Sequence, residues 1–162
     1  MVVLDPLRSS SILKNLHTLH IRMKQHSYNA MFLARKFRET GLPTAYAGLE
    51  DHPGHAVRTR MMNKEFGYGG MLNIDLGTAE RAAIFMEDME KNDVGYLAVS
   101  LGYFKTLFSN SGKSTSSEVP EDIQHDMGMS EGLVRYSVGL DNDIERTWDR
   151  IVLSLKKVDV IK

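Results

Sequence analysis

Apolar positions in the first quarter of the chain recur at alternating steps of three and four residues. They are Leu16, Leu19, Met23, His26, Ala30, Leu33 and Phe37. This spacing aligns the side chains on one helix face and predicts a long amphipathic helix over 16–37. Gly41 and Pro43 follow it, and a C-cap glycine before a proline predicts the end of the helix. On such an apolar face we expect His26 to be a hydrogen-bonded core histidine.

Further along, the pattern changes to the two-residue period of strands. Over residues 71–76, Met71, Asn73 and Asp75 fall on one face and the three aliphatic residues that alternate with them fall on the other. This alternation predicts a half-buried strand. Residues 133–140 alternate most regularly. Shorter runs predict strands over 44–49 and 94–101, and each predicted strand is flanked by turn-forming residues.

Between these strands, local signals indicate helices. A short helix is predicted over 55–62, and Thr78 can cap another. Pro120, followed by two acids, suits a helix start, and 141–143 opens a final helix. Alternating helices and strands predict an α/β sandwich, in which helices cover one face of a small, mainly antiparallel sheet. The order alone also allows a parallel sheet.

The composition bounds the class of protein. The chain has 162 residues, 42% of them apolar, which suits a single globular domain. Its 20 Lys and Arg residues are balanced by 21 Asp and Glu residues, so nucleic acid and anionic membranes are disfavoured partners. The lack of cysteine excludes disulfides and thiolate chemistry. Because no apolar run approaches the roughly 20 residues of a membrane span, we expect a soluble, cytoplasmic protein.

Two groups of residues resemble functional motifs without completing them. The Gly-Lys-Ser sequence at 112–114 lacks the upstream glycine of a phosphate-binding loop, so a polar surface loop is the better interpretation. His17 with His20, and His52 with His55, each offer two imidazoles. Two ligands do not make a metal site, and we predict none.

Arg135 is the more informative residue, because it lies in the middle of the predicted strand 133–140. A guanidinium there is costly unless its planar fork meets an acid. Its face carries the small neighbours Ser137 and Gly139, which leave space for bidentate capture of a substrate carboxylate. An edge-strand arginine paired with an internal Asp or Glu explains the spacing equally well, so both interpretations stay open.

Six short segments, spread in order over nearly the whole chain, match the pattern of a known family. They are Leu4-Asp5-Pro6; Leu16-His17-Thr18-Leu19-His20-Ile21-Arg22-Met23 with His26 and Asn29-Ala30; Gly48-Leu49 with His52-Pro53 and His55; Gly69-Gly70-Met71-Leu72; Leu97-Ala98-Val99-Ser100-Leu101-Gly102; and Gly132-Leu133-Val134-Arg135-Tyr136-Ser137-Val138-Gly139-Leu140. Together they resemble the C-terminal part of the pyridoxal-phosphate-dependent enzymes of cysteine and methionine metabolism. That family includes cystathionine γ-synthase, cystathionine lyases, methionine γ-lyase and O-acetylhomoserine sulfhydrylase.

The resemblance implies a fold-type-I C-terminal domain preceded by a long linking helix, in an enzyme that is usually a homotetramer. In the family, the arginine matching Arg135 binds the α-carboxylate of the amino-acid substrate, and the serine matching Ser100 lies beside that carboxylate. The residue before this serine helps to set specificity and is Val99 here. An apolar residue cannot pair with the distal ammonium of cystathionine, which favours methionine- or homoserine-type substrates.

The sequence also departs from the family pattern in the residues expected to line the site. Thr115 and Ser116 stand where many members have a Thr-His pair, and Tyr103 is bulkier than the usual residue. Serine-rich variants of this loop resemble a synthase-like branch of the family. The identity of the substrate therefore stays open, and so does the reaction type, which is either elimination or replacement.

The family's chemistry needs a Schiff-base lysine, and none of the ten lysines has the matching context. We therefore expect a linking helical segment over 1–41 and the small C-terminal domain over 42–162. The N-terminal domain that binds pyridoxal phosphate is expected to be missing or on a separate chain. The predicted function is the substrate-side domain of a pyridoxal-phosphate-dependent lyase or transferase, inactive and without cofactor on its own. The alternative is a non-catalytic remnant or assembly module of the same fold.

Overall fold

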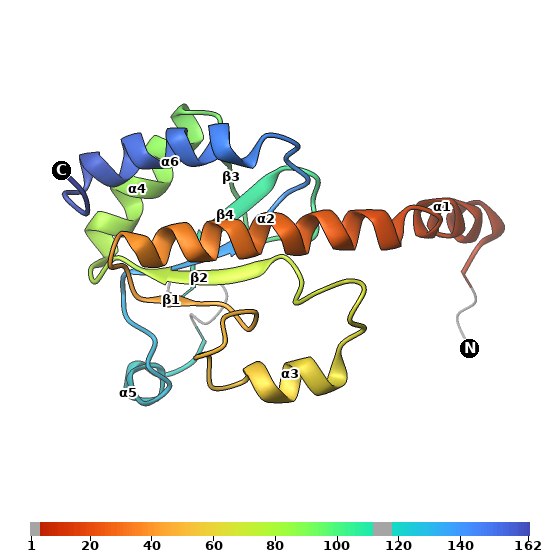
Figure 1. Cartoon of the computed structure of the whole chain (residues 1–162), viewed down its shortest axis with the longest axis horizontal. Coiled ribbons are helices and arrows are strands. Elements are labelled where there is room, and N and C mark those ends of the chain that lie inside the picture. Colours follow the sequence, from red (N-terminus) through yellow and green to blue (C-terminus); the bar gives the residue numbers. More distant parts are fainter. Residues whose placement is uncertain (1–3, 112–117) are drawn as a thin grey trace.

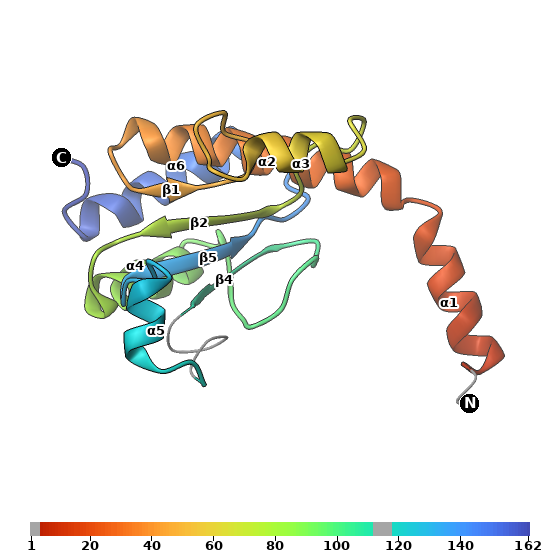
Figure 2. The same cartoon turned by 90° about the horizontal axis from the view of Figure 1, so that it is seen from below.

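Five strands build one sheet in the computed structural model of the chain, which describes residues 4–111 and 118–162. Their order across the sheet is β1-β2-β5-β4-β3 (Figure 2). β3 runs parallel to β4, and the other neighbours are antiparallel, which confirms the mainly antiparallel sheet. The strands are β1 (Thr44–Ala45), β2 (Met71–Asp75), β3 (Gly95–Leu97), β4 (Thr106–Asn110) and β5 (Leu133–Ser137).

Helices flank the sheet on both sides, and the first helix projects away from it (Figures 1 and 2). They are α1 (Pro6–Leu16), α2 (Leu19–Glu39), α3 (His55–Met61), α4 (Ala79–Lys91), α5 (Glu121–Asp126) and α6 (Ile144–Lys157). The buried residues of α2, α4 and α6 join those of the strands in one core, so these three helices cover one face as predicted. Figure 1 shows the short helices α3 and α5 on the opposite side of the sheet. All residues of α3 are half-buried or exposed, so this helix adds little to the core.

Aromatic residues lie at the centre of the core. Phe37 of α2 is fully buried, with its ring centroid 5.4 Å from that of Tyr136 on β5 and 5.3 Å from that of Trp148 on α6. The hydroxyl of Tyr136 donates to the sulfur of Met89 on α4 at 2.9 Å. Side chains from one strand and three helices thus meet here, because the predicted periodicities turn their apolar faces toward one another.

Polar groups of α2 hold the chain just after β5. The ring Nδ1 of buried His26 lies 2.6 Å from the carbonyl oxygen of Val138. The side-chain amide of Asn29 donates to the carbonyl oxygens of Gly139, at 3.0 Å, and Asp141, at 2.8 Å. The prediction of a hydrogen-bonded core histidine is therefore confirmed. These bonds satisfy carbonyls that leave the sheet ladder inside the protein.

The predicted single helix over 16–37 is wrong at its start. A turn at residues 17–18 separates α2 from α1, which the apolar pattern did not predict. The side chain of Asp5 caps α1 by accepting from the Arg8 amide at 3.0 Å, and Pro6 occupies the first turn. All eleven residues of α1 are exposed, and Figures 1 and 2 show it projecting away from the sheet. Without a buried face there is no core-facing stripe to read from the sequence.

The strand predictions differ from the structure most in three places, besides the earlier end of β5 at Ser137. β1 ends at Ala45, because the Leu49 amide donates to the carbonyl of Tyr46 at 3.0 Å and turns the chain. The strand predicted over 94–101 is limited to β3. β4 was missed, because residues 106–109 are buried on both faces and do not alternate.

A network around Asp88 joins α4 to α6 and makes stability depend on pH. Its carboxylate accepts from Lys157 at 2.5 Å, and from Ser154 and Asn92 at 2.9 Å each. The hydrogen bond from Lys157 is the main cause that lowers the pKa of Asp88. A carboxyl whose pKa is lowered by folding stabilises the native state above its unfolded pKa of about 3.9, and this contribution is lost as the pH falls through the folded value.

We therefore expect Asp88→Asn to lower the free energy of unfolding by about 1–2 kcal/mol at pH 7, since Lys157 is half exposed and solvent screens the pair. The difference between wild type and variant should shrink as the pH falls below about 4. Urea unfolding at pH 7 and pH 3 measures both values. A difference that is equal at the two pH values would contradict the assignment.

Candidate functional site

The face of the sheet turned away from α2 carries a row of polar side chains. Asn73 on β2 lies directly opposite Arg135 on β5, and Ser109 on β4 lies opposite Arg135 from the other side. We call these three residues the Arg135 row. Figure 2 views the sheet from this side, with α5 in front. The alternation of β5 sends Val134 and Tyr136 into the core and therefore turns Arg135 outward.

The guanidinium of Arg135 is half-buried and makes no hydrogen bond or ion pair with any residue that the structure describes. The acid on the same face of β2 is Asp75, which comes two residues after Asn73, the residue paired with Arg135. Its carboxylate instead accepts from the Gly77 amide at 2.8 Å and from the Ser130 hydroxyl at 2.5 Å. The internal ion pair that the sequence left open is thus absent among the side chains that the structure describes. A half-buried guanidinium in this state is set to receive an external anion.

The loop between β3 and β4 runs along the same side of the sheet. Its Gly102 amide donates to the hydroxyl of Ser137, two residues from Arg135, at 3.0 Å. Where the loop returns, a Cβ on Gly139 would lie 2.5–2.6 Å from backbone atoms of Phe104, Lys105 and Thr106, so only glycine fits. These contacts hold the loop against the end of β5.

This loop carries three of the residues that the sequence assigned to a site. Ser100 and Val99 are exposed, the latter by 62%, and Tyr103 packs against Phe104 with ring centroids 4.4 Å apart. In the described structure Ser100 and Arg135 are not hydrogen-bonded to each other, but the Gly102 contact brings their segments to the same face. Thr115 and Ser116, like the Gly-Lys-Ser sequence at 112–114, lie outside the described residues.

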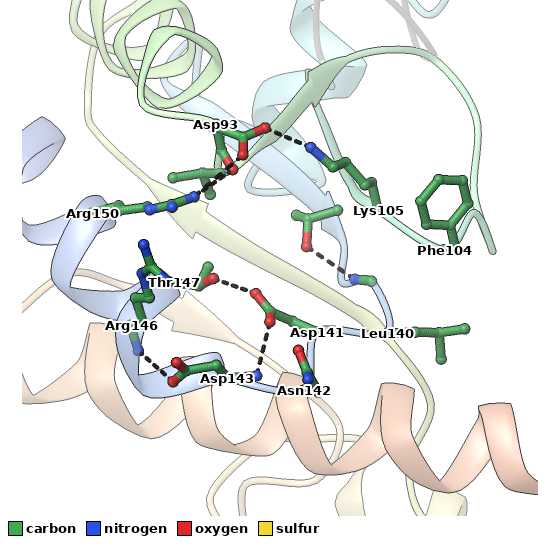
Figure 3. A pocket seen from close by; sticks show the side chains of 13 residues that line it. Asp93, Phe104, Lys105, Leu140, Asp141, Asn142, Asp143, Arg146, Thr147 and Arg150 are labelled. Atoms are coloured by element: carbon green, nitrogen blue, oxygen red, sulfur yellow. Dashed lines mark hydrogen bonds and ion pairs between the residues drawn. The ribbon is translucent and has the colours of Figure 1, made fainter.

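A cavity of about 300 Å³ lies elsewhere, between the start of α6 and the strand β4 (Figure 3). Its two half-buried cations share one acid: Asp93 accepts from Lys105 at 2.5 Å and from Arg150 at 3.4 Å. The Lys105 hydrogen bond lowers the pKa of Asp93, and the same contact raises the pKa of Lys105. Asp141 is bonded to Thr147. The half-buried cations of this cavity are therefore paired within the protein, in contrast to Arg135.

His52 and His55 are engaged locally, whereas His17 and His20 are exposed. His52 Nδ1 accepts from the Gly54 amide at 3.0 Å, and His55 Nδ1 lies 2.9 Å from the Ala47 carbonyl while its ring stacks on Tyr68. Over the described residues, no group of three His, Cys, Asp or Glu side chains is placed to hold a metal ion. In the same part of the chain, no helix combines the length and apolar character needed to cross a membrane.

Fold and site together define a class: a small α/β domain with a half-buried arginine, unpaired among the described side chains, beside a loop held on the same face. The sequence model of the family described as Cys/Met metabolism PLP-dependent enzyme matches residues 2–149. The chain therefore belongs to this family, as its motifs indicated.

Three relatives show how much of the family's length and fold this chain covers. The chain is 44% identical to a methionine γ-lyase of Arabidopsis thaliana over 131 residues, 80% of this chain and 30% of that protein. It is 31% identical to a cystathionine γ-lyase of Bacillus subtilis over 86% of this chain and 36% of that protein. It matches a crystal structure of cystathionine γ-synthase from Xanthomonas oryzae pv. oryzae in complex with cystathionine. The TM-score is 0.80 and the identity 26%, over 91% of this chain and 37% of that one. The fold-type-I assignment is thereby confirmed, and the chain spans about a third of the length of these relatives.

Pyridoxal phosphate requires a lysine for covalent attachment, and the described lysines do not fit that role. Such a lysine is activated by a lowered pKa. Lys105 has a raised pKa through its bond to Asp93, and Lys157 is held by Asp88. The remaining lysines that the structure describes are exposed, apart from Lys36, which is bonded to Glu39 at 2.8 Å. Every described lysine is thus either exposed or bonded to a carboxylate, unlike the activated lysine that attaches the cofactor.

Sequence reasoning identified Arg135 but missed its neighbours in the row. The alternation over 71–75 had placed Asn73 on the polar side of its strand, and Ser109 stands at the start of a serine-rich stretch of the sequence, 109–117. Only the strand register shows that both lie against Arg135.

Proposed function

We propose that this chain is the substrate-side domain of a pyridoxal-phosphate-dependent lyase or transferase of sulfur amino-acid metabolism, and that Arg135 binds the α-carboxylate of the substrate. The observation that carries the proposal is the half-buried guanidinium, which has no partner among the described residues. The family assignment supports it, because the family acts in cysteine and methionine metabolism.

In this proposal Arg135 presents two parallel N–H groups to the carboxylate, which fixes the substrate's position and orientation. Ser100 lies beside that carboxylate in the loop held by Gly102. Val99, exposed in the same loop, offers an apolar contact to the substrate side chain. Because it cannot pair with a distal ammonium, the site favours methionine- or O-acylhomoserine-type substrates over cystathionine. The 44% identity to a methionine γ-lyase supports this preference.

The cofactor chemistry would come from outside this chain. When bound, pyridoxal phosphate serves as an electron sink for the elimination or replacement reactions of such enzymes. Since the described lysines do not fit its attachment, we propose that the chain alone neither binds it covalently nor catalyses the reaction.

The partner would be the cofactor-binding domain, on the same or another polypeptide. Apolar residues exposed on α1 offer it a docking surface, among them Leu7 at 81% and Leu13 at 60% exposure. Such a helix face is normally covered by another protein element. A homo-oligomeric assembly, as in the family, is part of the same proposal.

Titration of the ¹⁵N-labelled chain with L-methionine, followed by NMR, tests the proposed function. We expect saturable shifts at residues of β5 and of the loop 98–105, because the guanidinium binds the carboxylate. L-methioninamide, which lacks the carboxylate, should give no shifts there and is the control. The assembly-module alternative predicts equal, unsaturated responses to both compounds, and that outcome would contradict the proposal.

Incubation of the chain with pyridoxal phosphate, followed by borohydride reduction, tests the cofactor prediction. We expect scattered, substoichiometric labelling of exposed lysines, because each described lysine is either exposed or bonded to a carboxylate. Mass spectrometry of the peptides locates the adducts. One stoichiometric adduct at a single lysine would show that the chain holds its own cofactor site.

A further inference from the structure

The polar residues on the Arg135 face fall into two groups. Asp75 and Ser137 are hydrogen-bonded within the protein. Asp75 accepts from Gly77 and Ser130, and Ser137 accepts from Gly102. The three members of the Arg135 row differ, since the side chains of Asn73, Arg135 and Ser109 make no hydrogen bond to any described residue. Three unpaired polar side chains therefore lie side by side across β2, β5 and β4.

Ser109 is the most unusual of the three. It is 5% exposed, and its Oγ is the buried side-chain polar atom that lacks a hydrogen-bond partner among the described residues. A buried hydroxyl in this state is destabilising, so it points to a partner that is gained in another state of the molecule.

Arg135 can provide that partner when it binds an anion. A guanidinium has five N–H donors, of which a bidentate carboxylate accepts two. The groups directly opposite in register, the Ser109 hydroxyl and the Asn73 carboxamide, are acceptors for the rest. Both are neutral, so they orient the fork without compensating its charge. An acid at either position would instead form an internal ion pair and compete with the ligand.

We propose that Asn73 and Ser109 are positioning residues of the Arg135 carboxylate site. They accept hydrogen bonds from the guanidinium in the ligand-bound state and hold its fork toward the substrate. This inference rests on the proposed function and extends it to two residues on neighbouring strands.

The test measures L-methionine binding by Ser109→Ala and Asn73→Ala in the NMR titration. We expect each dissociation constant to rise about three- to tenfold, because one hydrogen bond to the charged group is lost. Ser109→Thr keeps the hydroxyl and should restore the wild-type value. Ser109→Asp should weaken binding by more than tenfold through the internal ion pair. Ser10→Asp, which adds the same charge on exposed α1, should bind as wild type.

Urea unfolding of the same variants separates positioning from a structural role. Because the Ser109 hydroxyl is unbonded in the free protein, Ser109→Ala should leave the unfolding midpoint unchanged or raise it. A lower midpoint would overturn the positioning role. Wild-type affinity in both alanine variants, with binding lost in Arg135→Ala, would overturn this inference alone. Absence of saturable binding by the wild-type chain would overturn the proposed function together with it.

Discussion

Replacement of Arg135 by alanine is expected to abolish the saturable response to L-methionine, with at least about a thirtyfold loss of affinity. Removal of one member of a hydrogen-bonded charge pair typically costs 2–5 kcal/mol, and each 1.4 kcal/mol is a factor of ten. Arg135→Lys should also bind poorly, because an ammonium keeps the charge and loses the planar fork. The NMR titration with L-methionine measures both affinities.

Arg146→Ala provides the matched control, since it removes the same charge from an exposed residue near the start of α6 (Figure 3). Its affinity should equal that of wild type. Arg135→Ala should also be at least as stable as wild type in urea, because a half-buried, unpaired guanidinium contributes a desolvation cost. Wild-type binding by Arg135→Ala would remove Arg135 from the site.

Phe37→Ala is expected to lower the free energy of unfolding by about 3–5 kcal/mol, the largest stability change that we predict. Phe37 is fully buried, and its ring contacts Tyr136 and Trp148. The variant loses the apolar burial and both aromatic contacts, and it leaves a cavity between α2, β5 and α6. Fluorescence of Trp148, which is the chain's one tryptophan, reports urea unfolding directly at this place.

Phe104→Ala is the control for this prediction, because Phe104 is 57% exposed and lies outside the core. Its loss should change the free energy of unfolding by less than about 1 kcal/mol. Equal losses in the two variants would mean that α2 does not pack against the sheet as described, and the layer arrangement would then need revision.

Periodic segments were predictable because the information that decides them is local. The alternation over 71–75, the Thr78 cap and the final helix opened by 141–143 all correspond to observed elements. The Thr78 hydroxyl accepts from the Arg81 amide at 3.3 Å, as the cap required. Such patterns depend on backbone geometry, which is the same wherever the segment lies in the fold.

The elements that were missed depend on their surroundings. β4 is buried on both sides, so its residues lack the two-residue period by which a half-buried strand is recognised. α1 is exposed on all sides, so it lacks the stripe of a core-facing helix. In both cases the environment, rather than the local sequence, sets which side chains are covered.

The sequence by itself determined the family, the α/β class and the presence of an arginine in the middle of a strand. It left open whether an internal acid neutralises that arginine. The tertiary structure decided this point over the described residues, since Asp75 is bonded to Gly77 and Ser130 while Arg135 is unpaired. It also placed Asn73 and Ser109 against Arg135. The reason is that side-chain type is local, whereas strand register depends on pairing between segments far apart in the chain.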